Sequence, residues 1–341
     1  MRGPARASDH LLLNLAWVAL ACVVLVGTFL LPTNDAAQRV AATGLSTNAA
    51  TATAGIPATA GQTTKDERAR SAPVLDAYRG LASWVDIYDD RAWADPDAAV
   101  RDMANHGVRT LFVETGSSKS KTAVFDPQGQ AAFISAAHAR GMKVVAWYLP
   151  YLQDLRSDYD RIAQAVRFAT PDGQRFDSFA LDIESDAVTS VQTRNRALDT
   201  LSHKLRRLVG PSYPLGAIIP SPVGIAKKAG YWNDFPYASV AGTYDVFVPM
   251  GYYTYHGTGA GAAATDALDN ARILRAQPGC AKVPIHLIGG LAEKSTLAEV
   301  ASFAAATRKS GCIGASLYGW AGTTAAHWEA LKAVPSRTLG P

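Results

Sequence analysis

Two acidic residues two positions apart are the sharpest chemical feature of this 341-residue chain. Asp182 and Glu184 end the apolar run SFALDIE, which begins at Ser178. In a strand, residues i and i+2 project to the same side, about 7 Å apart along the backbone. Like charges this close, in a partly enclosed place, raise the pKa of one of them. A carboxylic acid that stays protonated near neutral pH can protonate the oxygen of a leaving group. We therefore predict that Glu184 is a general acid and that Asp182 orients it.

Two other interpretations of this acidic pair stay open. Both carboxylates could form ion pairs with lysine or arginine, or they could bind a metal ion. A D-x-E strand supplies only two oxygen ligands for Ca²⁺ or Mg²⁺, and no loop of further ligands follows it. We expect neither a metal nor a cofactor in this protein.

Acidic and aromatic side chains also end the other apolar runs of the sequence. Aromatic faces stack on the C–H faces of sugar rings, while carboxylates accept hydrogen bonds from hydroxyl groups and exchange protons at the glycosidic oxygen. This mixture predicts a polysaccharide as the partner. The candidate substrate-binding residues are Asp86, Glu114, Trp147, Tyr253 and Trp320.

A mechanism with two carboxyl groups is one route by which such a site could cleave a glycoside. It needs a second carboxyl group about 5–5.5 Å from the acid for retention of configuration, or about 6.5–9.5 Å for inversion. Asp86, Glu114 and Glu293 are the candidates. Glu293 lies beyond the seventh apolar run, where a surface ion pair is the plainer interpretation.

Eight apolar runs have to position these residues. Between the runs, Asp95-Pro96 and Asp126-Pro127 indicate helix starts, and Thr296 with Glu299 has the spacing of a capping box. Strands that alternate with helices imply parallel βαβ units. Eight units in about 250 residues predict the α/β class and a (β/α)8 TIM barrel, with its active site at the C-terminal ends of the strands. The runs occupy 84–88, 110–114, 143–149, 178–184, 214–220, 245–253, 284–290 and 313–320.

An open doubly wound sheet is the alternative fold. Asp86–Trp93, DIYDDRAW, follows the first run and contains no glycine-rich phosphate loop, so the usual nucleotide-binding interpretation fails. The formal charge is only +4, without a run of five like charges, which argues against a nucleic acid partner. A hydrophobic content of 48% excludes a disordered chain.

The segment Asp177–Glu184, DSFALDIE, resembles the D-x-x-D-x-D-x-E motif on the fourth strand of family eighteen glycoside hydrolases, the chitinases and endo-N-acetylglucosaminidases. Three of the four acidic positions match, and Ala180 replaces the remaining aspartate. VPMGYY is similar to the family's M-x-Y-[DN] segment through Met250 and Tyr252, with Tyr253 at the acidic or amide position.

Trp320, at the end of the eighth run, matches the tryptophan that floors the family's sugar subsite. The glycine-rich motif of the third strand is replaced by VVAWYLP. The resemblance implies a substrate-assisted mechanism in which Glu184 protonates the leaving oxygen and the acetamido group of the substrate attacks. It also implies that Asp182 and Tyr252 hold that group in place.

An uncharged run, Leu11–Leu31, is long enough to cross about 30 Å of hydrocarbon as a helix. Arg2 and Arg6 precede it, and positive residues favour the cytoplasmic side. A cleaved signal peptide is the alternative, but its apolar core usually has only about 7–15 residues. We predict a cytoplasmic N-terminus at 1–10, a single transmembrane signal anchor at 11–31, a disordered Ala/Thr-rich linker at 32–76, an extracytoplasmic barrel at 77–335 and a C-terminal tail at 336–341.

Cys280 lies four residues before the seventh run and Cys312 one residue before the eighth, so both belong on the N-terminal rim of adjacent strands. We predict a disulfide between them, because an exported protein permits one and the bridge would add roughly 3–4 kcal/mol by restricting the unfolded chain. Two unpaired buried thiols are the alternative.

Together these features predict a membrane-anchored, extracytoplasmic glycoside hydrolase with a monomeric ectodomain and Glu184 as general acid/base. Its substrate would be a cell-envelope or chitin-type polysaccharide. The alternative is a non-catalytic, glycan-binding barrel of the cell envelope, which Ala180 and the missing glycines of the third strand favour. A third interpretation is a structural envelope protein whose own loops fill the mouth of the barrel.

Overall fold

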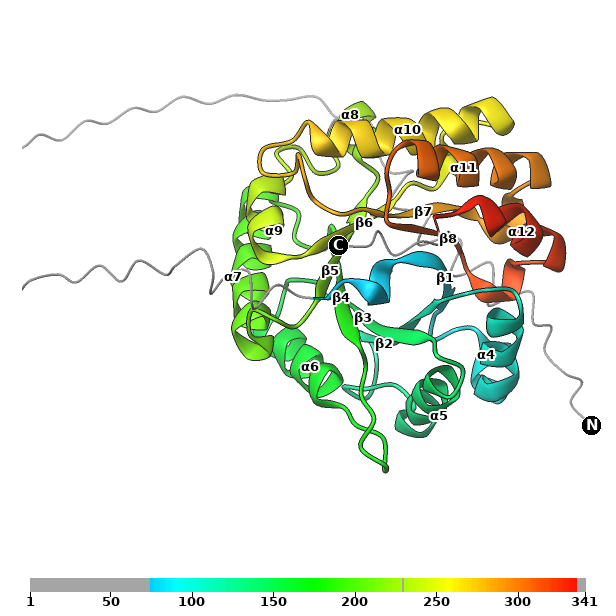
Figure 1. Cartoon of the computed structure of the whole chain (residues 1–341). Coiled ribbons are helices and arrows are strands. Elements are labelled where there is room, and N and C mark those ends of the chain that lie inside the picture. Colours follow the sequence, from blue (N-terminus) through cyan, green and yellow to red (C-terminus); the bar gives the residue numbers. More distant parts are fainter. Residues whose placement is uncertain (1–73, 229, 336–341) are drawn as a thin grey trace, which may run out of the picture. The chain divides into compact units, whose positions relative to one another are not determined.

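The computed structural model describes residues 74–228 and 230–335 of the chain. In this part, eight parallel strands close into a barrel in the order of the sequence, with helices around it (Figure 1). The predicted (β/α)8 barrel is confirmed. The strands are β1 (Gly80–Val85), β2 (Thr110–Ser117), β3 (Lys143–Leu149), β4 (Ser178–Asp182), β5 (Leu215–Pro220), β6 (Val246–Met250), β7 (His286–Leu291) and β8 (Gly314–Tyr318).

The helices begin where the sequence carries start signals. The side chains of Asp95 and Asp126 cap the helices that follow them, and Thr296 and Glu299 form a capping box. The helices are α3 (Asp90–Ala94), α4 (Pro96–Asn105), α5 (Pro127–His138), α6 (Leu155–Arg167), α7 (Val191–Val209), α8 (Pro222–Lys227), α9 (Tyr237–Thr243), α10 (Ala260–Arg275), α11 (Leu297–Lys309) and α12 (Ala325–Ala330). Short 3-10 helices are η1 (Asp76–Tyr78), η2 (Tyr253–Tyr255), η3 (Ala292–Lys294), η4 (Trp320–Gly322) and η5 (Leu331–Ala333).

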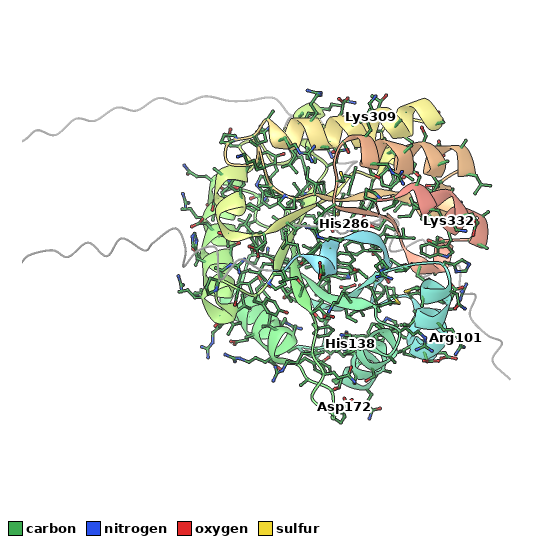
Figure 2. The ribbon with its side chains drawn as sticks, in the orientation of Figure 1. Arg101, His138, Asp172, His286, Lys309 and Lys332 are labelled. Atoms are coloured by element: carbon green, nitrogen blue, oxygen red, sulfur yellow. The ribbon has the colours of Figure 1, made fainter. Side chains whose placement is uncertain are left out.

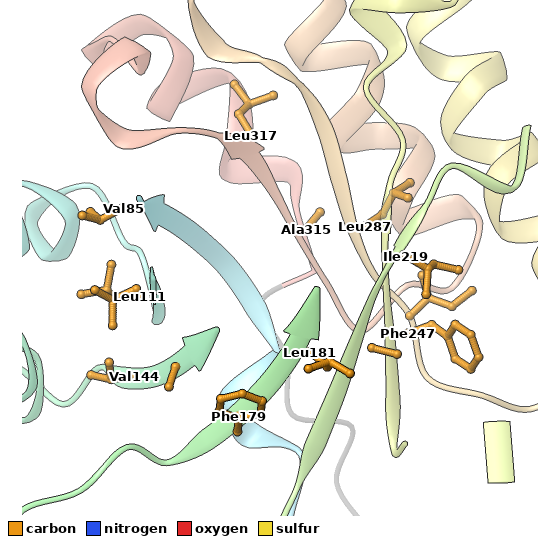
Figure 3. Packing of buried hydrophobic residues seen from close by; sticks show 14 of the residues in the cluster. Val85, Leu111, Val144, Phe179, Leu181, Ile219, Phe247, Leu287, Ala315 and Leu317 are labelled. Carbon is orange, nitrogen blue, oxygen red and sulfur yellow. The ribbon is translucent and has the colours of Figure 1, made fainter. Parts of the chain in front are cut away.

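Strand side chains alternate between two apolar layers. Trp84 and Phe112 pack inside the barrel, with their ring centroids 4.1 Å apart. Val85, Leu111 and Leu181 belong to the outer layer, between the barrel and its helices (Figure 3). This period of two decides which residue at each strand end projects into the mouth of the barrel.

The 3-10 helix η1 lies across the N-terminal ends of the strands. The Tyr78 hydroxyl lies 2.6 Å from Oγ of Ser178, the first residue of β4. A Cβ on Gly216 would approach that hydroxyl to 2.6 Å, so only glycine fits there. Nδ1 of His286, which Figure 2 labels inside the ring of helices, lies 2.9 Å from the Tyr78 carbonyl oxygen. This end of the barrel is therefore closed by the chain's own residues.

Both cysteines of the described residues are buried free thiols, so the predicted disulfide between Cys280 and Cys312 is absent from the structure. Sγ of Cys280 is directed to the Tyr237 carbonyl at 3.8 Å, whereas Sγ of Cys312 lies 3.3 Å from Oγ of Ser310. The alternative of two unpaired thiols is correct. Adjacent strand starts bring the two residues to the same rim, but local packing turns their side chains to different partners.

The predicted cytoplasmic segment, membrane anchor and C-terminal tail lie outside the described residues, as does the linker apart from its last three residues. Within residues 74–228 and 230–335, no helix has both the length and the apolar character that a membrane crossing requires.

Candidate active site

Four carboxyl groups gather at the C-terminal rim of the barrel, and we call them the acidic rim. Glu114 and Asp182 are buried inside the ends of β2 and β4, whereas Asp86 and Glu184 follow β1 and β4 and are partly exposed. The strand β4 ends at Asp182, so Glu184 follows the strand and does not lie on it as predicted, and the charge of Glu184 acts on Asp182. The acidic rim consists of Asp86, Glu114, Asp182 and Glu184.

The pKa values of Glu184 and Asp182 are both raised. Burial, followed by the charge of Asp186, raises the pKa of Glu184 to about 7. Burial and then the charges of Glu184 and Glu114 raise the pKa of Asp182 well above its ordinary value. Both carboxyl groups therefore hold a proton more readily than a free carboxyl group does, and Glu184, with a pKa of about 7, can exchange its proton near neutral pH.

Glu114 and Asp86 form the other half of the acidic rim. Burial, together with the charges of Asp86 and Glu184, raises the pKa of Glu114 to about 8, although the backbone N–H of Ile87 donates to its Oε2 at 3.1 Å. Burial also raises the pKa of Asp86, whose Oδ2 accepts a hydrogen bond from the Tyr318 hydroxyl at 2.9 Å. The site thus holds several carboxyl groups that resist ionisation.

No positive side chain neutralises the acidic rim. Within the described residues, no ion pair joins any of its four members to a lysine, arginine or histidine. The described part of the chain also contains no group of three histidine, cysteine, aspartate or glutamate side chains arranged as metal ligands. The interpretation of Asp182 and Glu184 as a salt-bridged structural pair therefore does not hold.

Two buried polar atoms near the acidic rim have no hydrogen-bond partner. They are Oδ1 of Asp182 and Nε1 of Trp147. Ala180, at the position where the resembling family has an aspartate, pairs in register with Trp147 and precedes Asp182 by two residues. Its methyl group cannot bond either atom. Since an unpaired buried polar atom costs about 1–3 kcal/mol, both are candidates to bind a ligand.

A row of aromatic rings crosses the mouth beside the acidic rim. Trp147 lies edge-on to Trp84 with centroids 6.0 Å apart, and Trp84 lies 6.1 Å from Tyr318. Tyr318 is 6.1 Å from Tyr252, and Tyr252 is 6.1 Å from Tyr255. Trp147 and Trp84 are buried, whereas Tyr318 and Tyr252 are partly exposed and Tyr255 is exposed, so the three tyrosines are the rings of this aromatic row that a ligand can reach.

The structure brings three of the predicted binding residues and the predicted catalytic tyrosine to this site. Asp86 and Glu114 belong to the acidic rim, and Trp147 and Tyr252 belong to the aromatic row. The charges of Glu184 and Asp182, after burial, raise the pKa of the Tyr252 hydroxyl, which places this hydroxyl close to both acids.

Two predicted binding residues lie elsewhere. Tyr253 is buried in the outer layer, where its ring packs 5.6 Å from Phe303 and its hydroxyl donates to Ser295 at 2.9 Å. Its neighbour Tyr252 points to the mouth, and Tyr253 points the opposite way. The prediction that Tyr253 binds substrate is therefore not supported.

Trp320 is also buried in the outer layer. Its Nε1 donates to Asp102 at 2.8 Å, and the Arg91 guanidinium lies over its ring at 4.8 Å. The strand β8 ends at Tyr318, and the chain then turns into η4, so the alternation that would have pointed Trp320 inward stops two residues too early.

Two tyrosines that the sequence interpretation did not select complete the site. Tyr318 occupies the inward position at the end of β8 and donates to Asp86. The alternation of β8 was a usable signal, because Tyr318 follows the inward-facing Ser316 by two residues. Tyr231 donates to the backbone carbonyl of Glu184 at 2.8 Å. It comes from the segment between β5 and β6, and no local pattern indicated its contact with the end of β4.

No known family model and no curated protein matches the sequence. The fold is similar to that of the spore cortex-lytic enzyme of Bacillus cereus, with a TM-score of 0.57 at 10% identity over 75% of this chain and 74% of that chain. The endo-beta-1,4-mannanase of Thermotoga petrophila gives 0.55 at 11% identity over 71% and 68%. A family GH18 chitinase of Cycas revoluta gives 0.54 at 10% identity over 74% and 98%. The resemblance to family eighteen thus extends to a shared barrel fold, which is all that identities this low show.

Proposed function

We propose that this protein is a membrane-anchored, extracytoplasmic glycoside hydrolase that acts on a cell-envelope or chitin-type polysaccharide. The observation that carries the proposal is the partly exposed Glu184 carboxyl, whose pKa is raised to about 7 beside three other carboxyl groups and an aromatic row. Structural neighbours named as chitinases, a mannanase and a cortex-lytic enzyme support a glycan as the substrate.

In the proposed reaction, protonated Glu184 donates its proton to the glycosidic oxygen as the bond to the anomeric carbon breaks. The substrate's acetamido oxygen attacks that carbon from the other side, and protonated Asp182 and Tyr252 hold the acetamido group. Water then opens the cyclic intermediate, and the Glu184 carboxylate takes the proton from that water. Asp86 and Glu114 are positioned to accept hydrogen bonds from sugar hydroxyl groups when they are ionised.

The decisive variant is Glu184→Gln, which keeps the size of the side chain and removes its exchangeable proton. We expect the release of reducing ends from chitin or peptidoglycan to fall about 10²–10⁴-fold, because that is the usual contribution of a general acid. Glycan binding, measured by affinity electrophoresis, should stay within about twofold of wild type.

The matched control is Glu329→Gln, an exposed residue on α12 whose ion pair with Lys332 lies on the surface. This variant should cleave the same glycans at the wild-type rate. If wild type, variant and control all bind a glycan and none of them cleaves it, the protein is the non-catalytic binding barrel that Ala180 favours.

A further inference from the structure

The N-terminal face of the barrel, opposite the acidic rim, is where the described chain both begins and ends. Val74 directly precedes η1, which covers the starts of the strands. At the other end, the carbonyl of Pro335 lies against Gly80, the first residue of β1. Any segment that tethers the barrel through its N-terminus therefore leaves from this face.

Five exposed cationic side chains at this face have no hydrogen bond or ion pair to any described residue, and we call them the cationic face. Two of them precede β2 and β7, and three lie in the last turns of α6, α7 and α11, which lead to the starts of β4, β5 and β8. Figure 2 shows one of them, Lys309, on the outside of the helical ring. The five residues are Arg109, Arg167, Arg207, Lys282 and Lys309.

Carboxylates at the same end do not neutralise the cationic face. Asp177 is held by Lys143 at 2.8 Å, and Asp245 is held by Arg206 at 2.7 Å. Asp172 is an exposed acid at this end that has no cationic partner among the described residues. Its carboxylate accepts hydrogen bonds from the uncharged side chains of Thr170 and Gln174. The unpaired positive charges therefore exceed this unpaired negative charge.

Helix dipoles explain only part of this pattern. A cation in the last turn of a helix is stabilised by the dipole, which accounts for Arg167, Arg207 and Lys309. Arg109 and Lys282 belong to no helix. Their exposure at the same end as the other three indicates a surface that meets an anionic partner.

The length of chain before the barrel suggests what that partner is. Residues 32–73 separate the predicted membrane anchor from Val74. A flexible linker of this length has a root-mean-square span of roughly 35–40 Å, so the barrel would remain within about its own diameter of the lipid. A surface held this close needs only weak attraction to settle on the membrane.

We propose that the cationic face lies on anionic lipid headgroups of the membrane that tethers the chain, with the acidic rim turned outward to the polysaccharide. This inference rests on the membrane anchor of the proposed function. Each lysine or arginine near an anionic bilayer contributes roughly fivefold to the association constant. The acidic rim, at the other end of the barrel, has no cationic member to attract the same headgroups, so the orientation with the cationic face on the lipid is favoured.

The test uses the full chain reconstituted in vesicles of phosphatidylcholine alone or of phosphatidylcholine with phosphatidylglycerol. Hydrogen exchange is followed in the loops that precede β2 and β7. Exchange should be slower in the anionic vesicles than in the neutral ones, and high salt should abolish the difference, because headgroup attraction is screened.

The variant Arg109→Gln/Arg207→Gln/Lys282→Gln removes three charges of the cationic face. It should lower the docking equilibrium constant roughly 100-fold. The thermal midpoint should fall only slightly, because these side chains bond to no described residue and only Arg207 is stabilised by a helix dipole. The control Lys121→Gln/Arg156→Gln/Lys227→Gln removes three exposed charges from the C-terminal side of the barrel and should dock like wild type.

The possible outcomes distinguish the docking of the cationic face from the presence of the membrane anchor. Binding of the chain to the vesicles is measured by flotation. If the chain floats with neutral vesicles and its hydrogen exchange does not depend on the lipid, the inference is overturned and the anchor is left intact. Flotation with anionic vesicles alone would support the cationic face and contradict the anchor. Flotation with neither would overturn both. Protection by soluble polyphosphate but not by anionic vesicles would replace the membrane with a polyanion as the partner.

Discussion

At the scale of single residues, the chemistry of this protein depends on carboxyl groups that are buried and form no ion pair with any described residue. Asp182 is buried, and its burial together with the charge of Glu184 raises its pKa. Glu184 meets solvent and titrates near neutrality, so it is the group that can both donate and recover a proton. Ala180, two residues before Asp182, offers no hydrogen bond to the unpaired Oδ1 of Asp182.

The pKa of Glu184 predicts how activity depends on pH. Its acidic form exists below pH of about 7 and is lost above it. We therefore expect kcat/KM for glycan cleavage to fall tenfold per pH unit on the alkaline side of about pH 7. A profile that stays flat to pH 9 would contradict the assignment of Glu184 as the acid.

The raised pKa of Glu114 leads to a separate prediction about the stability of the protein. Its pKa is about 8 in the folded protein and 4.5 in its ordinary environment, so the folded state binds the extra proton and stability is lost as the pH rises from about 4.5 to 8. Glu114→Gln should raise the free energy of unfolding at pH 8 by up to about 4 kcal/mol and change it by less than about 1 kcal/mol at pH 5. Urea unfolding at the two pH values measures this, and an equal effect at both would refute it.

At the scale of elements, two segments distant in sequence fix the backbone that carries Glu184. The Tyr231 hydroxyl donates to the Glu184 carbonyl at 2.8 Å. The buried Arg194 on α7 links the segment that follows β4 to the segment that carries Tyr231. Its Nε donates to the carbonyl of Val188, and its Nη1 donates to the carbonyl of Tyr231. Tyr231 and Arg194 are positioning residues, since neither is argued to touch the reacting atoms.

Tyr231→Phe should therefore lower kcat about tenfold with KM changed less than about twofold, because the loss of one hydrogen bond to a partly buried carbonyl costs about 1–1.5 kcal/mol. The matched control is Tyr213→Phe, which removes a buried hydroxyl that has no hydrogen-bond partner. This control should leave kcat unchanged and should not lower the thermal midpoint. Equal kinetic effects of the two variants would remove the positioning role of Tyr231.

At the scale of the whole molecule, the acidic rim and the cationic face occupy opposite ends of the barrel. The acidic rim surrounds the C-terminal ends of the strands, and the cationic face surrounds their starts. The described chain begins at the end of the barrel that carries the cationic face, so a tether at its N-terminus would leave from that end. A barrel tethered there and held by its cationic face would present Glu184 away from the lipid, toward polysaccharide in the envelope.

The alternation of apolar runs and helix caps was enough to predict the barrel, because period-two strands and capped helices are local patterns. The same reasoning placed Glu184, Asp182, Asp86 and Glu114 at the C-terminal rim. These positions follow once the strand ends and the inward-facing residues are known. The alternation also contained the position of Tyr318.

Tertiary structure decided what local patterns do not encode. Tyr231 reaches Glu184 from a distant segment, and Trp320 turns toward α4 because β8 ends early. Cys280 and Cys312 share a rim but bond to different partners. The raised pKa values of Asp182 and Glu184 depend on burial by the closed barrel. Contacts between residues far apart in sequence produced each of these results, whereas the periodicity of the sequence records only which side of an element a residue faces.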